Sequence, residues 1–530
     1  MDAIVVADSG ADTFSGTNPL KLTIDGRIGD IQTVQNLVAN GGRLQLPIQG
    51  ACRMNWAAAP TLNGIYLKSF LAQHGFKIAL INSFYEERDA FLASVKKSPR
   101  AILISTTFIT NKSTLTRLTN DIRSLAPGIP IIAGGPFIFL SHGIFQRAHQ
   151  KEYVSQEIKK GYLFLEVDQE PAIDLYIASA RGEHMAQEAL QRLTTGAGLS
   201  DIPNNAIFKE GRYTFSKRVD DLAAPMPPID WQGLEPQIFA SGVVPVQASS
   251  GCPYHCAFCN FVKDPKTARV KPIEELIEEM RCISRRGGRY IWFVDDNFRL
   301  GQNDLEAVCR KIIAADLNVA WMTFVRASTL DHIDPGLLRR AGCIEVQLGL
   351  ESADPQILRN MNKKASPDLY EKVLHKLLSA GINCSCYLLF GFPGETEASV
   401  QRTIAFMKKF DDLKDGGTIA WSMFPFIVAP LSPVYEPAMR EKYRLEGYLQ
   451  HWRHATMDAR QAAGYVRQAF LSVASSSAIY RSDNLEYLAQ LKPAQRHDFH
   501  RIRQQLAQKA TAVELTRKEI LDAFKPVFQE

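Results

Sequence analysis

Six short apolar segments recur between residues 243 and 424, and helical periodicity fills the stretches between them. The segments are VVPVQAS (243–249), YIWFVD (290–295), VAWMTFV (319–325), IEVQLGL (344–350), CSCYLLFGF (384–392) and TIAWSMF (418–424). Alternating strands and helices form parallel sheets, because each helix carries the chain back to the start of the next strand. The pattern predicts a partial (β/α)6 barrel of the TIM type, with its chemistry at the carboxyl ends of the strands.

A second run of alternation lies closer to the N-terminus. An amphipathic helix is expected over residues 63–74. Buried parallel strands are expected at IVVAD near the N-terminus, KIALI (77–81), AILIST (101–106), PIIAGG (130–135) and YLFLEV (162–167). These strands indicate a Rossmann-like α/β domain, whose ligand would lie beyond the carboxyl ends of its strands. The predicted fold class is therefore α/β.

A chain of 530 residues is too long for one compact core. Prolines in AAPMPPIDW cannot continue a helix or a central strand, and IPNNAIFKEGRYTF before them is typical of a small hairpin. The expected domains are a Rossmann-like domain with an N-terminal extension (1–195), a linker with a hairpin (196–240), the barrel (241–427) and a helical C-terminal region (428–530). Residues 10–59 match no pattern that we can assign.

Bulk properties exclude several classes of protein. Lys and Arg number 61 against 56 Asp and Glu, a surplus too small for a dedicated nucleic-acid binder. No stretch offers about 18 uncharged apolar residues, and the N-terminus lacks a basic region before an apolar one. We therefore expect a soluble, cytoplasmic protein without a membrane span.

The nine cysteines argue against a disulfide framework, because their number is modest and odd. Three are crowded into eight positions. The others are predicted to be small buried hydrophobic residues: Cys52, Cys282, Cys309, Cys343, Cys384 and Cys386.

The crowded cysteines form a C-x3-C-x2-C motif directly after the first barrel strand. Cys252, Cys256 and Cys259 lie in SSGCPYHCAFCNF, where three thiolates can converge on one metal centre at the barrel mouth. Three ligands leave a position open for a substrate, as in catalytic zinc sites. A structural zinc site is the alternative, and it needs a fourth ligand. His255 is a candidate, although its place between two ligands makes convergence awkward.

This motif resembles that of the radical S-adenosylmethionine (SAM) superfamily, C-x3-C-x-Φ-C, with Phe258 as the aromatic residue. The resemblance covers residues 243–426. It implies that Cys252, Cys256 and Cys259 hold a [4Fe-4S] cluster, and that the methionine amine and carboxylate of SAM bind the fourth iron. Phe258 would lie near the adenine.

The resemblance also suggests further SAM contacts at the strand ends. Asp295 stands where relatives carry a Gly-Gly-Glu that binds the methionine amine, although the glycines are absent here. Arg326 would face the methionine carboxylate, and Glu351 the polar edge of the cofactor. Gly391 and Gly394 would let the backbone approach the adenine. The alternative is that these residues are turn glycines and solvated loop charges.

The N-terminal domain resembles the cobalamin-binding module of class B radical SAM methylases. The resemblance rests on the turn Ser105-Thr106-Thr107, on the Gly134-Gly135 pair after the next strand, and on an acidic turn within VDQEPAIDLYIASARGE. Hydroxyls of the turn would bind the corrin edge, and the glycines would let a flat base approach the sheet. The chain has no D-x-H-x-x-G segment, so the resemblance implies cobalamin without a histidine on its lower face.

The segment LQHWRHATMDARQAAGYV looks like a motif in the helical tails of cobalamin-dependent relatives. On a helix, His451 and His454 would share a face, and His454 would then face the substrate. The alternative is a surface helix with its aromatic residues buried on the barrel. Phe499, Ile502 and Leu506 are expected to share one face of a later helix.

The resemblance implies methyl transfer from methylcobalamin to an unactivated carbon, or to phosphorus, of a small-molecule or peptide-derived substrate. A 5'-deoxyadenosyl radical would first abstract a substrate hydrogen, and an external donor such as flavodoxin or ferredoxin would supply the electron. Two alternatives stay open: an oxidative cyclisation or rearrangement with the same cofactors, and a non-catalytic zinc-binding protein. The sequence does not identify the substrate.

Overall fold

The structure is a computed structural model that describes residues 1–8, 22–29, 34, 60–149, 155–167, 169–220, 228–260, 269–298, 302–476 and 491–528. It divides into two compact units. The first comprises Met1–Phe14 and Ala59–Ile238, and the second comprises Ser15–Ala58 and Phe239–Glu530. The domain boundaries given above stay a prediction.

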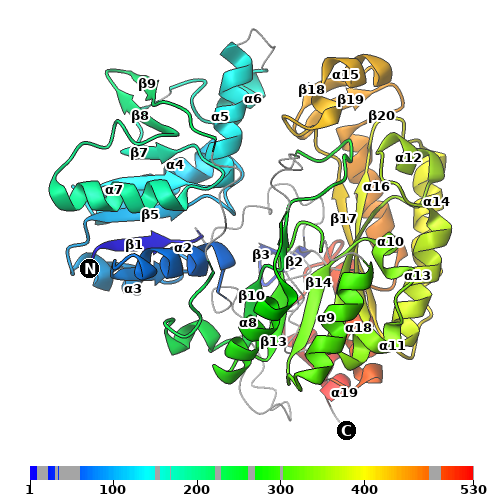
Figure 1. The fold of residues 1–530 in the computed structure, drawn as a ribbon. Helices are drawn as coiled ribbons and strands as arrows, with labels where there is room; N and C mark the ends of the chain where they lie inside the picture. The colour runs from blue at the N-terminus through cyan, green and yellow to red at the C-terminus, as the bar shows by residue number, and fades with distance from the viewer. Residues whose placement is uncertain are drawn as a thin grey trace. The chain divides into compact units, whose positions relative to one another are not determined.

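The first unit is built on a seven-stranded sheet of order β4-β1-β5-β6-β7-β8-β9 (Figure 1). Its strands are β1 (Ala3–Val6), β4 (Ile78–Ile81), β5 (Ala101–Ser105), β6 (Ile131–Gly134), β7 (Leu175–Ile177), β8 (Asn205–Lys209) and β9 (Arg212–Phe215). The first five in that order run parallel, and β8 and β9 extend the sheet as an antiparallel hairpin. In chain order the parallel strands are arranged 2-1-3-4-5, so the sheet is of the doubly wound, flavodoxin-like kind.

Helices cover this sheet on both faces, as a parallel sheet requires. They are α2 (Leu62–Gln73), α3 (Arg88–Val95), α4 (Lys112–Leu125), α5 (Pro136–His149), α6 (Gln156–Gly161) and α7 (Glu183–Thr195). Phe70 and Leu71 of α2 join Ala189 and Leu190 of α7 in one apolar core with the strands. The Rossmann-like fold is thereby confirmed.

One predicted strand of this unit is wrong. Residues 162–167 form no strand, and the fifth parallel strand is β7 instead. Phe164 has a φ of +70°, a left-handed conformation that interrupts an extended backbone. Tyr162, Leu163 and Phe164 are nevertheless buried. The apolar run therefore indicates that the segment is buried, but an irregular segment can be buried as well as a strand can.

The second unit contains a six-stranded parallel sheet in which the strands follow chain order (Figure 1). They are β10 (Val243–Val246), β13 (Tyr290–Phe293), β14 (Ala320–Phe324), β15 (Cys343–Glu351), β16 (Asn383–Phe390) and β17 (Ile419–Pro425). The helices between them are α8 (Ile273–Arg285), α9 (Gln302–Ala314), α10 (Ala327–Leu330), α11 (Pro335–Arg340), α12 (Pro355–Asn360), α13 (Pro367–Ser379) and α14 (Glu397–Lys408). All six predicted segments contain strands, and the partial barrel is confirmed.

Smaller elements complete the second unit. They are the hairpin of β2 (Leu22–Ile24) and β3 (Arg27–Gly29), the pair β11 (Ser249–Ser250) and β12 (Arg269–Val270), and the 3-10 helices η2 (Pro236–Phe239, at the junction with the first unit) and η4 (Pro433–Tyr435). The C-terminal helices are α15 (Pro437–Tyr443), α16 (Ala459–Ser472), α18 (Pro493–Ala510) and α19 (Arg517–Phe528). None of the helices in the described ranges combines the length and apolar character that crossing a bilayer requires.

The predicted helix around His451 and His454 is wrong. These residues form β19 (His451–His454), paired between β18 (Glu446–Tyr448) and β20 (Met457–Asp458) in an antiparallel sheet. Side chains alternate along a strand, so residues three apart point to opposite faces. His454 is buried and His451 is exposed. Burial alternates along the strand, since Trp452 is buried and Arg453 is exposed, but the sequence HWRH has no apolar-polar alternation that could have predicted it. On α18, Phe499 is buried, but Ile502 and Leu506 are only half-buried.

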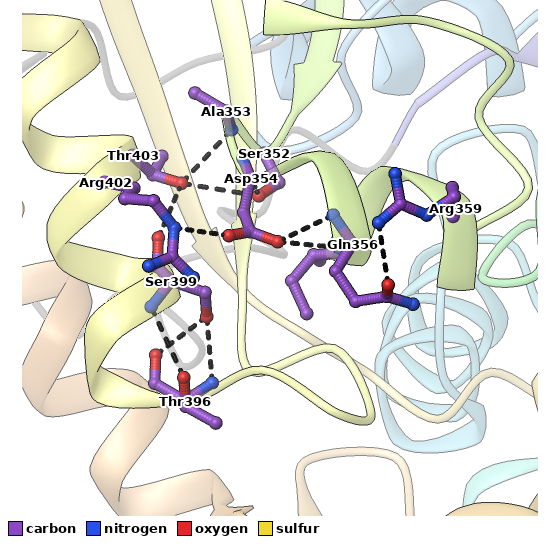
Figure 2. Close-up of polar contacts among 10 residues, drawn as sticks. Ser352, Ala353, Asp354, Gln356, Arg359, Thr396, Ser399, Arg402 and Thr403 are labelled. Atoms are coloured by element: carbon purple, nitrogen blue, oxygen red, sulfur yellow. Dashed lines mark hydrogen bonds and ion pairs between the residues drawn. The ribbon is translucent and has the colours of Figure 1, made fainter.

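A polar network fixes the turn that follows β15 (Figure 2). Asp354 caps α12 by accepting from the backbone N–H groups of Gln356 and Ile357, both at 2.9 Å. The Nε of Arg402, on α14, donates to Asp354 at 2.6 Å. Thr403 accepts from the N–H of Ala353 at 3.1 Å. The carboxyl end of β15 is thus tied to the helix that follows β16.

We predict that Asp354→Ala lowers the melting temperature by several degrees, because it removes a helix cap and an ion pair together. Loss of such a cap costs about 1–2 kcal/mol, and Asp354 is only 2% exposed. Arg402→Ala is the matched control, since it removes the ion pair but keeps the cap. Its guanidinium side chain is 57% exposed, so its effect should stay below about 1 kcal/mol. Equal melting temperatures for the wild type and Asp354→Ala, measured by differential scanning fluorimetry, would contradict this account of the turn.

Candidate functional site

The cysteine motif follows β11, just beyond the carboxyl end of the first barrel strand. Cys256 is buried, whereas Cys252 and Cys259 are half-buried. Backbone hydrogen bonds hold Ala257 within the loop: its N–H donates to Met361 O, and its carbonyl accepts from Val434 N–H, both at 2.9 Å. The loop is thus anchored to segments that follow β15 and β17.

Among the residues that the structure describes, no three His, Cys, Asp or Glu side chains are grouped to hold one metal ion. A structural zinc site needs such a grouping, with four ligands around one atom. In a four-iron cluster each cysteine binds its own iron, so the sulfur atoms need not surround one point. Thiolate is the donor that iron-sulfur clusters use.

Arg326 lies directly against the cysteine loop. It follows β14, and its Nη1 is 3.7 Å from the Sγ of Cys256. The guanidinium carbon is 3.8 Å from the centre of the Tyr254 ring, and Nη2 donates to the carbonyl of Lys363. Arg326 therefore places a positive charge beside Cys256.

A buried ion pair joins Glu351, a candidate SAM contact, to Lys363. Glu351 ends β15 with a φ of +66°, and its Oε1 lies 2.9 Å from Lys363 Nζ. The same ammonium lies 5.8 Å from the centre of the Phe258 ring. Gly349 makes room for the pair, because a Cβ there would lie 2.6 Å from Glu351 Oε1. Sequence reasoning missed Lys363, which no motif spacing marks.

Asp295 follows β13 and binds the backbone that leads to the cysteines. It accepts from the N–H groups of Ser249 and, at 3.4 Å, of Ala248. Asp296 accepts from Gly251 N–H at 3.0 Å. Burial raises the pKa of Asp295 to about 7. In this structure its carboxylate holds the loop in place, and its contact with a methionine amine stays a prediction.

The Gly391–Glu395 turn follows β16 and packs against the C-terminal strand β19. Gly391 and Gly394 have φ of +95° and +92°, a region that favours glycine. A Cβ on Gly391 would lie 2.5 Å from the Trp452 ring. The Nε2 of His454 lies 3.2 Å from the carbonyl oxygen of Gly391. Although it is not on a helix, His454 therefore sits beside the predicted adenine turn.

The candidate cobalamin residues lie together at the carboxyl edge of the first sheet. Asn63 Nδ2 donates to the carbonyl of Ala7, after β1, and to Ser105 Oγ at the end of β5, both at 2.8 Å. Ser105 Oγ is 3.1 Å from Thr107 Oγ1. Thr106 Oγ1 donates to Gly134 O at 2.9 Å. Asn63 thus bridges the two strands between which chain order reverses, where doubly wound sheets bind ligands.

This edge carries both close backbone packing and unsatisfied polar atoms. Gly135 has a φ of +112°, and a Cβ there would lie 3.0 Å from Thr106 Oγ1. The buried oxygens Asn63 Oδ1, Thr61 Oγ1 and Ser83 Oγ have no hydrogen-bond partner. Buried polar groups normally have one, so these oxygens suit a ligand with donor groups. Sequence reasoning missed Asn63, whose place in the first turn of α2 was the available signal.

The cysteines outside the motif are mostly core residues. Cys309, Cys343, Cys384 and Cys386 are buried and Cys282 is half-buried, whereas Cys52 lies outside the described residues. Burial raises the pKa of the Cys384 and Cys386 thiols. They therefore stay protonated, in contrast to what a metal ligand requires.

The Gly391–Glu395 turn makes a pH-dependent prediction. Glu395 is fully buried and accepts from Gly391 N–H. Burial, with a smaller contribution from Asp354, raises its pKa from 4.5 to about 8. The folded protein therefore binds a proton that the unfolded chain releases. Between these two pKa values, each unit of rising pH destabilises the wild type by up to about 1.4 kcal/mol.

Glu395→Gln cannot ionise and should escape this loss. The melting temperature of the variant minus that of the wild type should grow as pH rises from about 5 to about 8, and stay constant above. Glu397→Gln, at an exposed position two residues further on, is the control and should show no such growth. A Glu395→Gln difference that does not change with pH would refute the buried neutral carboxyl.

Comparison with known proteins finds a family model that matches the part of the chain that contains the site. The model of the radical SAM superfamily matches residues 246–407. An uncharacterized methyltransferase of Pyrococcus horikoshii is 29% identical over 251 residues, which is 46% of this chain and 54% of that protein. The bacteriochlorophyllide d C-12(1)-methyltransferase of Chlorobaculum tepidum is 31% identical over 173 residues, 32% of this chain and 38% of that protein. The chain thus spans about half or less of these relatives' lengths.

Two solved structures share the fold. The cobalamin-dependent SAM radical enzyme OxsB with aqua-cobalamin bound aligns at a TM-score of 0.59 and 12% identity, over 100% of this chain and 84% of that one. The radical SAM methyltransferase TsrM from Kitasatospora setae, with cobalamin and a [4Fe-4S] cluster bound, gives 0.54 and 15%, over 82% and 74%. The chain therefore carries a radical SAM domain at residues 246–407 and has the fold of cobalamin-dependent radical SAM enzymes.

Proposed function

We propose that this chain is a cobalamin-dependent radical SAM methyltransferase that moves a methyl group from methylcobalamin to an unactivated carbon, or to phosphorus, of a small-molecule or peptide-derived substrate. The observation that carries the proposal is the cysteine motif at the carboxyl end of β10, with Arg326 against Cys256. The two methyltransferase relatives support the reaction type.

Residues around the motif fit a cluster and SAM. Cys252, Cys256 and Cys259 offer thiolates, and a cluster bound there would supply the electron that cleaves SAM. Arg326 offers a positive charge for the methionine carboxylate. Phe258 offers a ring to the adenine.

Residues at the ends of β13, β15 and β16 complete the proposed SAM site. Glu351 offers a carboxylate to the polar edge of SAM, and Lys363 holds that carboxylate in place. The backbone at Gly391 and Gly394 is the proposed contact for the adenine, and Asp295 positions the cysteine loop. An external flavodoxin or ferredoxin is the proposed electron donor.

The edge of the first sheet fits cobalamin, which would supply the methyl group. A corrin carries carboxamide side chains at its rim, and these have N–H donors for the open oxygens of Asn63 and Ser83. Ser105, Thr106 and Thr107 add hydroxyls. Gly134 and Gly135 keep side chains out of the way of a flat base.

A second candidate uses the same cofactors for an oxidative cyclisation or rearrangement without methyl transfer. It is favoured by the anaerobic magnesium-protoporphyrin IX monomethyl ester cyclase of Rubrivivax gelatinosus, 26% identical over 157 residues, 29% of this chain and 28% of that protein. Product mass separates the two functions. A gain of one methylene with release of S-adenosylhomocysteine supports methyl transfer, and its absence under reducing turnover supports the alternative.

We expect the anaerobically reconstituted wild type to hold about four iron atoms and to absorb near 400 nm, as thiolate-bound clusters do. Cys256→Ala should lose most of that iron, because one of three protein ligands is gone. Cys282→Ala removes a half-buried cysteine outside the motif and should keep it. Zinc in place of iron in the wild type would contradict the proposal, as would a Cys256→Ala variant with a full cluster.

Gly134→Val should weaken cobalamin binding at least tenfold, about 1.4 kcal/mol, because a Cβ there would lie 3.3 Å from the Cβ of Ile177 and the added methyl groups would crowd the sheet edge proposed for the base. Gly198→Val is the control in the same unit, since a Cβ there meets open space. Absorbance titration with hydroxocobalamin measures both. Equal affinities for wild type and Gly134→Val would remove the glycine pair from the cobalamin site.

A further inference from the structure

The two faces of the barrel sheet differ in what they carry. Trp321 and Trp421 point toward the helices, because Trp321 Nε1 donates to Ala341 O at 2.7 Å and the Trp421 ring lies 6.4 Å from that of Phe406 on α14. Paired residues of neighbouring strands point to the same side of a sheet. The register therefore assigns the opposite, inner face to Trp292, Met322, Phe324, Glu345, Gln347, Ser385, Tyr387, Ser422 and Phe424.

The inner face is not a closed apolar core. Side chains on the outer face are almost entirely buried, with Phe293 and Trp321 each 1% exposed. On the inner face, Trp292, Phe324 and Phe424 all keep exposed surface. Interiors of complete TIM barrels are filled by branched apolar side chains. Here polar and aromatic residues take the place of most of them, beside a small apolar cluster of Met322 and Ile344.

Gln347 stands out on this inner face. It is 1% exposed, and neither Nε2 nor Oε1 of its carboxamide has a hydrogen-bond partner. Ser422 Oγ and Trp292 Nε1, also on this face, are buried without partners as well. Burying such groups unpaired destabilises the protein. A ligand that pairs with them would account for their presence.

We propose that Gln347 binds the substrate through a carboxamide or lactam edge, which presents an N–H donor beside a carbonyl acceptor. The Gln347 carboxamide offers the complementary acceptor and donor, and the two groups can pair through both. This inference takes the barrel interior as the substrate site of the reaction proposed above, and it rests on that proposal.

Neighbouring residues restrict the ligand further. Ser385, the register partner of Gln347, donates to Glu345 Oε1 at 2.7 Å. A carboxylate at this position disfavours an anionic group, so the bound edge is neutral. Phe324, the partner on the other side, is half-buried. A phenyl ring has no polar group, so it can turn aside for a ligand without losing a hydrogen bond.

The first test separates a ligand role from a structural one. Gln347→Leu removes an unpaired buried amide, so the melting temperature should stay equal or rise. Gln504→Leu is the matched control at another glutamine with 1% exposure. Its amide donates to Phe470 O and accepts from Ser476, so this variant should melt several degrees lower. A fall for Gln347→Leu as large as that for Gln504→Leu would assign Gln347 to the fold and overturn the proposal.

The second test uses benzamide as the probe and methyl benzoate, which lacks the N–H donor, as its control. Binding to reconstituted enzyme with SAM is measured by ligand-observed NMR titration. The wild type should prefer benzamide, and Gln347→Leu should bind it at least tenfold more weakly, about the effect of one or two hydrogen bonds. Binding of methyl benzoate should not change.

Equal benzamide affinity in wild type and Gln347→Leu would overturn the proposal, as would a wild type that does not prefer benzamide. Slow cleavage of SAM without substrate, with dithionite as reductant, is the internal control. Normal SAM cleavage with failed benzamide recognition refutes the substrate chemistry alone, whereas no SAM cleavage in the wild type refutes the proposed function.

Discussion

The parallel register of the six barrel strands is the constraint on which the second unit depends. Because all six run in one direction, every strand delivers its following loop to the same edge. Cys256 after β10, Asp295 after β13, Arg326 after β14 and Glu351 at the end of β15 meet there although they are far apart in sequence. The contacts among these loops then hold the cysteine motif from several sides.

Charge is distributed unevenly around that motif. Arg326 faces the Cys256 sulfur and Lys363 lies near Phe258, so two cations lie next to residues of the motif. Positive charge there favours an anionic ligand group such as the carboxylate of SAM. The nearby carboxylates have partners of their own. Glu351 pairs with Lys363, and Asp295 accepts from the backbone N–H of Ser249.

Sequence periodicity predicted the elements better than it predicted their partners. The structure contains the six predicted barrel strands and four of the five strands predicted for the first sheet. These strands were predictable because a strand buried on both faces is a short, continuous apolar run. The strand predicted over residues 162–167 is absent, because an apolar segment can be buried without forming a strand. The helix predicted around His451 and His454 is absent, because a strand of four residues is too short to give a recognisable pattern beside helical segments. Lys363 and Gln347 were not predictable from motifs, because tertiary contacts alone give each its neighbours, whereas the signal for Asn63 was its place in the first turn of α2.

The central claim is that three cysteines hold a cluster with one iron left for SAM. Electron paramagnetic resonance of the reduced, reconstituted protein tests it most directly, with SAM whose methionine carboxylate and amine carry 17O and 15N. The account predicts that added SAM shifts the cluster signal and that hyperfine coupling to both labels appears. A cluster spectrum that is unchanged by SAM, with no coupling to either label, would contradict it.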